Sequence, residues 1–183
     1  TTVAGTDVLQ WRRQQLARGG TAADLDWLLD LAGGLRWASL QQLLLDPTRT
    51  VALEQSLEVL SELWARHLHG NVPLQHLVGL CPWRDVLLES SPAALIPRQE
   101  TELLVDLALS QFTTTPPARW ADLGTGSGAI AVALARAWPT APGHGVDLSP
   151  DALQLAERNL QGCAPHHNCS LHLGSWWSPL KSW

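Results

Sequence analysis

A glycine-rich segment holds the residues whose types and spacing suggest chemistry. We expect it to join the end of a strand to the start of a helix, where glycine permits a tight turn and a close backbone approach to a ligand. Its residues are Asp122, Leu123, Gly124, Thr125, Gly126, Ser127 and Gly128. Asp147 ends the next predicted strand, about 20 residues later, where a carboxylate can bind both hydroxyls of a ribose. The pattern predicts a nucleoside site.

The same glycines fit two kinds of nucleotide site. Gly124, Gly126 and Ala129 satisfy the G-x-G-x-x-G/A fingerprint of dinucleotide-binding domains, in which an acid also follows. Two features favour a class I methyltransferase instead. Asp122 precedes the first glycine, where that class uses an acid near the methionine end of its cofactor, and Gly128 completes a D-x-G-x-G-x-G pattern.

The elements around the glycine segment are predicted to alternate. We expect strands at 119–123, 143–147 and 169–173, and helices at 101–111, 129–138 and 149–160. Ser149 suits the N-cap of the last helix and Pro150 its first position. Alternating strands and helices are typical of right-handed β-α-β units and a parallel sheet, so the predicted fold class is α/β.

The residues before this region are predicted to form a small helical bundle. Apolar residues recur at helical spacing in segments near 7–18, 21–32, 40–44 and 50–69. Prolines and glycines interrupt the region that follows, where we expect strands at 83–89 and 93–96 to form a hairpin. These patterns divide the chain into a helical domain at 1–72, a linker with a hairpin at 73–100, and an α/β domain at 101–183.

Three segments upstream of the glycines agree with a single family. Residues 95–102, Leu-Ile-Pro-Arg-Gln-Glu-Thr-Glu, are similar to an IPR-P-E-T-E signature, with Gln99 in place of its second proline. Residues 72–79, Val-Pro-Leu-Gln-His-Leu-Val-Gly, resemble a P-L-Q-Y-L-x-G linker, and 43–47 falls where the family has its small helical domain. With the glycine segment, the chain resembles the release-factor glutamine methyltransferases of the HemK type over nearly its whole length.

The resemblance implies a small N-terminal helical bundle followed by an incomplete class I, Rossmann-like methyltransferase domain. It implies that the cofactor is S-adenosyl-L-methionine and that the glycine-rich loop wraps around it. By the same resemblance, Asp147 binds the ribose and Trp176 packs on the adenine. The predicted cofactor-binding residues are Asp122, Gly124, Thr125, Gly126, Ser127, Gly128, Asp147 and Trp176. Ser175 stands where the family usually has an acid, which weakens the similarity at the adenine contact.

The resemblance also implies a substrate, the side-chain amide of the glutamine in the Gly-Gly-Gln motif of class 1 peptide chain release factors. The helical domain would dock that partner. The family grips the amide with an Asn-Pro-Pro-Tyr motif, which does not occur in this sequence, so we name no catalytic residue. We expect the chain to be a fragment that is inactive alone, with 119–123 as an open sheet edge. The alternatives are a DNA or RNA adenine-type N-methyltransferase and a non-catalytic fragment that binds a release factor.

Composition disfavours several classes of protein. A net charge of −5 and the lack of a long basic run argue against direct nucleic-acid binding. We find no secretory signal and no apolar run of the roughly 18 residues that a membrane span needs. Three cysteines indicate reduced thiols and a cytoplasmic protein. Cys163, His166, His167 and Cys169 are zinc-ligand types, but we read 163–169 as a loop and a strand start and expect no metal.

Two further groups of residues are predicted to be structural. Most of the ten tryptophans, such as Trp27, Trp64 and Trp138, fall at positions expected to pack in a core. Glu100 and Glu102 do not share a helix face, so we do not expect them to act as an acid–base pair.

Overall fold

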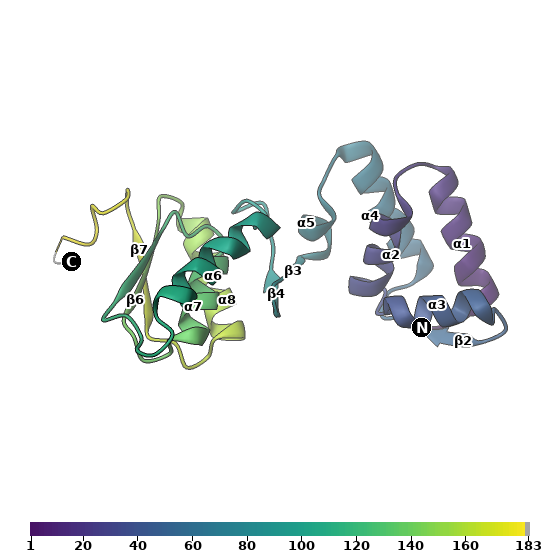
Figure 1. The fold of residues 1–183 in the computed structure, drawn as a ribbon. Coiled ribbons are helices and arrows are strands. Elements are labelled where there is room, and N and C mark those ends of the chain that lie inside the picture. The colour runs from purple at the N-terminus through teal and green to yellow at the C-terminus, as the bar shows by residue number, and fades with distance from the viewer. Residues whose placement is uncertain (182–183) are drawn as a thin grey trace. The chain divides into compact units, whose positions relative to one another are not determined.

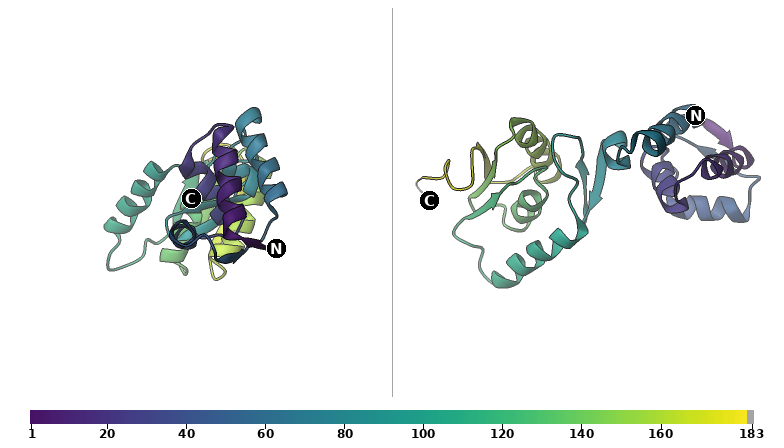
Figure 2. Two further views of the ribbon diagram at one scale, coloured as in Figure 1. Left: turned by 90° about the vertical axis from the view of Figure 1, so that its right-hand side faces the viewer. Right: turned by 90° about the horizontal axis from the view of Figure 1, so that it is seen from above.

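The computed structural model describes residues 1–181, which form two compact units, Thr1–Val78 and the part from Gly79 onward. Figures 1 and 2 show the helices of the first unit and the sheet of the second. Within residues 1–181, no helix is both long enough and apolar enough to cross a membrane.

The first unit is a helical bundle with one short strand pair. Its elements are β1 (Thr2–Ala4), α1 (Gly5–Ala17), α2 (Ala22–Leu31), α3 (Trp37–Leu45), β2 (Thr50–Ala52), α4 (Leu57–Gly70) and α5 (Leu74–Val78). The core contains Leu25, Leu28, Leu60 and Trp64, all fully buried, and Trp27 packs against it. Burial of these apolar side chains stabilises the bundle.

The predicted helix at 50–69 is wrong over its first turns. Residues Thr50–Ala52 form β2, which pairs antiparallel with β1, because β-branched Thr50 and Val51 favour extended backbone. Helix α4 begins only at Leu57, after Ser56 accepts a hydrogen bond from the Val59 N–H as its N-cap. Leu53 is nevertheless buried, as its apolar character predicts.

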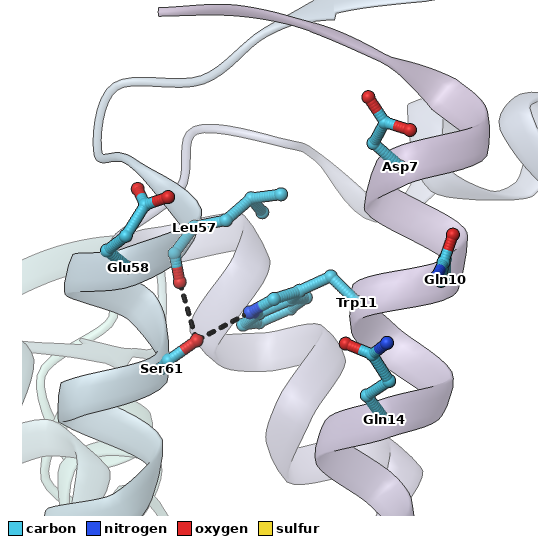
Figure 3. Close-up of a pocket in the computed structure, with 7 residues that line it drawn as sticks. All are labelled: Asp7, Gln10, Trp11, Gln14, Leu57, Glu58 and Ser61. Carbon is cyan, nitrogen blue, oxygen red and sulfur yellow. Dashed lines mark hydrogen bonds between the residues drawn. The ribbon is translucent and has the colours of Figure 1, made fainter.

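A hydroxyl links helices α1 and α4. Trp11 Nε1 donates to Ser61 Oγ at 2.7 Å, and Gln15 Nε2 donates to the same oxygen at 3.2 Å. Ser61 in turn donates to the Leu57 carbonyl at 2.7 Å (Figure 3). One hydroxyl therefore satisfies the polar groups of two buried side chains, Trp11 and Gln15.

The second unit is an α/β layer preceded by a hairpin. Its elements are β3 (Leu80–Trp83), β4 (Val86–Glu89), a 3-10 turn (Gln99–Thr101), α6 (Glu102–Gln111), β5 (Trp120–Leu123), α7 (Ala129–Ala137), β6 (Gly143–Asp147), α8 (Pro150–Cys163) and β7 (Cys169–Leu173). The sheet has the order β5-β6-β7 with both pairs parallel. In Figure 1, α6, α7 and α8 lie to one side of it. The predicted α/β class and parallel sheet are confirmed.

The register of the sheet places large and small residues side by side. Trp120 pairs with Gly143, and Asp122 with Gly145. A Cβ on Gly143 would lie 2.1 Å from the Trp120 ring, so the glycine leaves the space that the indole fills. Strand β5 is at one end of the order, and within residues 1–181 it has no strand on its other side.

The segment between the predicted domains differs from the expected linker. Helix α5 belongs to the first unit, whereas the hairpin of β3 and β4 packs against α8 in the second. The prediction of a strand at 93–96 is wrong, because Pro92 has no N–H for strand pairing at the start of this segment. Leu95 within it is 91% exposed. The hairpin instead turns at Arg84, whose N–H donates to Glu102 Oε1 at 3.3 Å and whose guanidinium pairs with Asp106 at 2.8 Å.

Replacing Ser61 by Ala should destabilise the helical unit. The buried Trp11 and Gln15 N–H groups would lose their acceptor, at a cost of about 1–3 kcal/mol. Urea unfolding followed by far-UV circular dichroism measures the loss. Glu62→Ala, an exposed change on the same helix, is the control and should cost less than about 0.5 kcal/mol; equal losses in both variants would contradict the role given to the hydroxyl.

Candidate functional site

The loop between β5 and α7 has the backbone conformation that its glycines predict. The φ angles of Gly124, Gly126 and Gly128 are +79°, +55° and +81°, a region that favours glycine. A Cβ on Gly128 would lie 3.0 Å from the Ala156 Cβ, so this glycine allows α8 to approach. Apart from its two chain neighbours, no residue of the described range 1–181 has an atom within 4 Å of a Cβ built on Gly124. That side of the loop is open to a ligand.

Hydrogen bonds close the loop over the end of β6. The N–H groups of Gly124 and Thr125 both donate to the Val146 carbonyl, at 2.8 and 2.9 Å. The Gly128 N–H then donates to the Thr125 carbonyl at 2.8 Å. The loop is thereby fixed to the neighbouring strand without help from a ligand.

The Asp147 carboxylate is held by two backbone donors at the end of β6. Its Oδ2 accepts the Gly126 N–H at 2.8 Å, and its Oδ1 accepts the Ser149 N–H at 2.9 Å. A carboxylate oxygen can accept more than one hydrogen bond, so each oxygen keeps capacity for a hydroxyl donor. The side chain is oriented and partly exposed, as a ribose contact requires.

A second carboxylate, Asp122, lies under the loop. It is 8% exposed, and its Oδ2 accepts the Thr125 hydroxyl at 2.7 Å. Burial raises the pKa of Asp122 above its ordinary value, and the charge of Asp147 adds to the rise, whereas the hydrogen bond from Thr125 opposes it. An acid in the position of Asp147 is expected in both kinds of nucleotide site. Asp122 adds a second negative charge near the loop, which favours a cationic ligand over a pyrophosphate.

Trp176 lies in a turn anchored beside Asp147. The Gly174 N–H donates to the Asp147 carbonyl at 2.9 Å, and the turn that follows is closed by the Ser178 N–H on the Ser175 carbonyl. Trp176 is 71% exposed, as is Leu148. The exposed Trp176 indole therefore lies in the turn that follows Gly174, whose N–H binds the Asp147 carbonyl. The predicted adenine contact stays a prediction.

Asn159 is a site residue that the sequence reasoning missed. Only 2% exposed on α8, it donates from Nδ2 to the Ser127 carbonyl at 2.8 Å and to the Glu89 carbonyl at 3.1 Å. Its Oδ1 accepts the Glu89 N–H at 2.6 Å. The available signal was an amide within the buried helix stripe that contains Leu155, Ala156 and Leu160.

The cysteines and histidines of 163–169 do not converge. Cys163 Sγ donates to the Leu87 carbonyl of β4 at 3.5 Å, whereas Cys169 lies on β7, where burial raises the pKa of its thiol to about 11. Thiolates are the zinc-binding form, and burial also raises the pKa of Cys163. Across residues 1–181, no group of three or more His, Cys, Asp or Glu side chains is arranged to hold a metal ion.

A groove between α1 and α4 is a weaker candidate for a ligand site. Figure 3 shows Asp7 and Glu58 on its rim, with Trp11 and Ser61 at its floor. Both acids lie in first helical turns, where the helix dipole stabilises them. The Ser61 hydroxyl is fully engaged by its neighbours, so its one proton is already donated and it offers a ligand no free donor.

Comparisons with known proteins show a similarity to methyltransferases. Residues 121–178 match the family described as "Methyltransferase domain". The release factor glutamine methyltransferase of Prochlorococcus marinus is 55% identical over 179 residues, covering 97% of this chain and 61% of that protein. The one from Synechocystis sp. is 35% identical, covering 98% and 62%. A solved precorrin-6y C5,15-methyltransferase from Geobacter metallireducens aligns at 21% identity over 46% of this chain and 42% of that chain, with a TM-score of 0.37, too low to add to the argument.

The parallel sheet, the glycine loop and the family match define part of a class I, Rossmann-like methyltransferase domain, whose cofactor is S-adenosylmethionine. The chain is a relative of the release factor glutamine methyltransferases and spans about three fifths of the length of the first relatives that it matches. The predicted family resemblance and fold class are confirmed.

Replacing Asp122 by Asn should change how stability depends on pH. Because the pKa of Asp122 is raised by folding, the unfolded chain loses this proton first, and wild-type stability falls as pH rises through the raised pKa. The variant lacks this titration, so its stability relative to wild type should improve from about pH 4 upward and then level off. Urea unfolding across that range measures the difference; a difference independent of pH would contradict the burial argument.

Proposed function

We propose that the chain supplies the S-adenosylmethionine pocket of a methyltransferase that modifies the glutamine of the Gly-Gly-Gln motif in class 1 peptide chain release factors. The observation that carries the cofactor part is the pair of carboxylates, Asp122 and Asp147, on either side of an open glycine loop. The substrate part rests on two relatives that are release factor glutamine methyltransferases, and the Gly-Gly-Gln motif rests on the family resemblance.

The residues present fit the cofactor. Asp147 would accept hydrogen bonds from the ribose hydroxyls, and the ligand would lie against the backbone at Gly124, where the space around the missing Cβ is open. Asp122 would attract the cationic methionine end through its charge. When bound, the sulfonium supplies an activated methyl group, and a neutral amide nitrogen must be held in line with it and lose a proton.

Release-factor binding is assigned to the helical unit. We propose that the bundle docks the factor while the α/β unit holds the cofactor, as the family resemblance implies. The net charge of −5 argues against a nucleic-acid substrate, and methyl transfer to DNA or RNA would be detected in the assay described below.

Replacing Asp147 by Ala should abolish or strongly weaken cofactor binding. Loss of hydrogen bonds to a charged acceptor costs about 1.5–3 kcal/mol each, or roughly 10-fold or more in the dissociation constant. Calorimetric titration with S-adenosylmethionine measures it, with exposed Asp151→Ala in the first turn of α8 as the matched control. Unchanged binding by the Asp147 variant would remove the assigned ribose contact.

The chain alone should bind the cofactor without transferring its methyl group. The Asn-Pro-Pro-Tyr residues that grip the amide in this family do not occur in the sequence, so the nucleophile is not aligned, and alignment supplies about 7–11 kcal/mol in favourable cases. A radiolabelled methyl-transfer assay with a release factor, and in parallel with DNA and RNA, tests this. Turnover by residues 1–183 on any of the three would contradict it.

A further inference from the structure

We infer that Asn159 is a positioning residue for the cofactor loop and that it couples this loop to the β3–β4 hairpin. The inference deepens the proposed function and rests on it for the identity of the ligand. Asn159 itself faces carbonyl groups of the protein and makes no part of the open side of the loop.

The contacts of Asn159 join three separate parts of the chain. From α8, its amide reaches Ser127 in the loop and Glu89 at the end of β4, with three hydrogen bonds of 2.6 to 3.1 Å. The bond to the Ser127 carbonyl orients the peptide that leads into Gly128, whose φ of +81° starts α7. Gly128 also packs closely on Ala156, one helical turn before Asn159. Loop and helix therefore fit together through this amide.

The hairpin side of the link is equally specific. The Glu89 N–H and carbonyl both bind Asn159, so the backbone polar groups of this β4 residue both face the side-chain amide. Two contacts place the segment that follows the hairpin. Trp83 Nε1 on β3 donates to the Arg98 carbonyl at 3.0 Å, and Ala94 lies 3.8 Å from a Cβ built on Gly126. The segment that follows β4 thus passes beside the loop. A change at the loop can reach the hairpin through a continuous set of contacts.

A buried amide with all three bonds made holds both partners in one geometry, because breaking any of these bonds would cost each partner a buried hydrogen bond. Arg158 offers a matched comparison. It is the preceding residue on α8 and pairs with the Glu89 carboxylate at 2.6 Å, and its other hydrogen bond goes to the Gln154 carbonyl of its own helix rather than to the loop. Both side chains of the pair are about half exposed. Replacing Arg158 removes its ion pair with Glu89 of the hairpin and leaves the hydrogen bond from Asn159 to Ser127 in place.

The test compares amide hydrogen exchange, measured by NMR without ligand, in wild type, Asn159→Leu and Arg158→Ala. Leucine conserves volume and removes all three bonds. We expect exchange at Gly126 and Gly128 to become roughly 10-fold faster in Asn159→Leu, the scale of one buried hydrogen bond, and to stay unchanged in Arg158→Ala. Amides of the helical unit report whether the effect is local. Equal loop exchange in all three proteins would overturn the inference.

A second measurement adds the ligand, first to the wild-type chain and then to Asn159→Leu. If Asn159 couples the two parts, adding S-adenosylmethionine should slow exchange of the Glu89 N–H, and Asn159→Leu should weaken cofactor binding by a similar roughly 10-fold factor. A ligand that slows exchange in the loop but not at Glu89 would refute the coupling. Absence of any binding by wild type would refute the proposed function instead, and the ligand-free comparison would still decide the role of Asn159.

Discussion

The hydrogen bond from the Gly126 N–H to Asp147 Oδ2 ties the loop after β5 to the end of β6. It requires the parallel pairing of these strands, because that pairing brings the two carboxyl ends to one edge of the sheet. It also requires positive φ angles at Gly124, Gly126 and Gly128, where any residue with a side chain would strain the backbone. The carboxylate that would bind a ribose is therefore oriented by the loop that would contact the rest of the ligand.

The charge of Asp122 favours S-adenosylmethionine over a dinucleotide as the ligand of this loop. Asp122 is buried on β5 directly before the loop, and burial raises its pKa, with the negative charge of Asp147 adding to the rise. The charge of Asp122 would repel the pyrophosphate of a dinucleotide and attract the sulfonium and ammonium groups of S-adenosylmethionine. Asn159 donates to the Ser127 carbonyl of the same loop, whereas the open space lies at Gly124. The residue that holds the loop is therefore different from the residues that would contact the ligand.

The strands at 143–147 and 169–173 have the predicted bounds, and Pro142 and Gly174, which do not favour strand, stand just outside them. The start of α8 followed from Ser149 and Pro150. The pairing of β1 with β2 could not be predicted, since each has three residues and the contact joins distant parts of the chain. Asn159 was missed for a related reason: an amide on a helix gains its role only from carbonyls that the fold places opposite it.

The central claim is that the glycine loop and Asp147 form a site for S-adenosylmethionine. It is tested most directly by following backbone amide NMR shifts of the whole chain during titrations with S-adenosylmethionine and, separately, with NAD. The account predicts saturable shifts at Gly124 to Gly128 and at Asp147 to Ser149 with the first ligand and none at the same concentration of the second. Shifts of this loop with NAD, or S-adenosylmethionine shifts confined to the groove between α1 and α4, would contradict it.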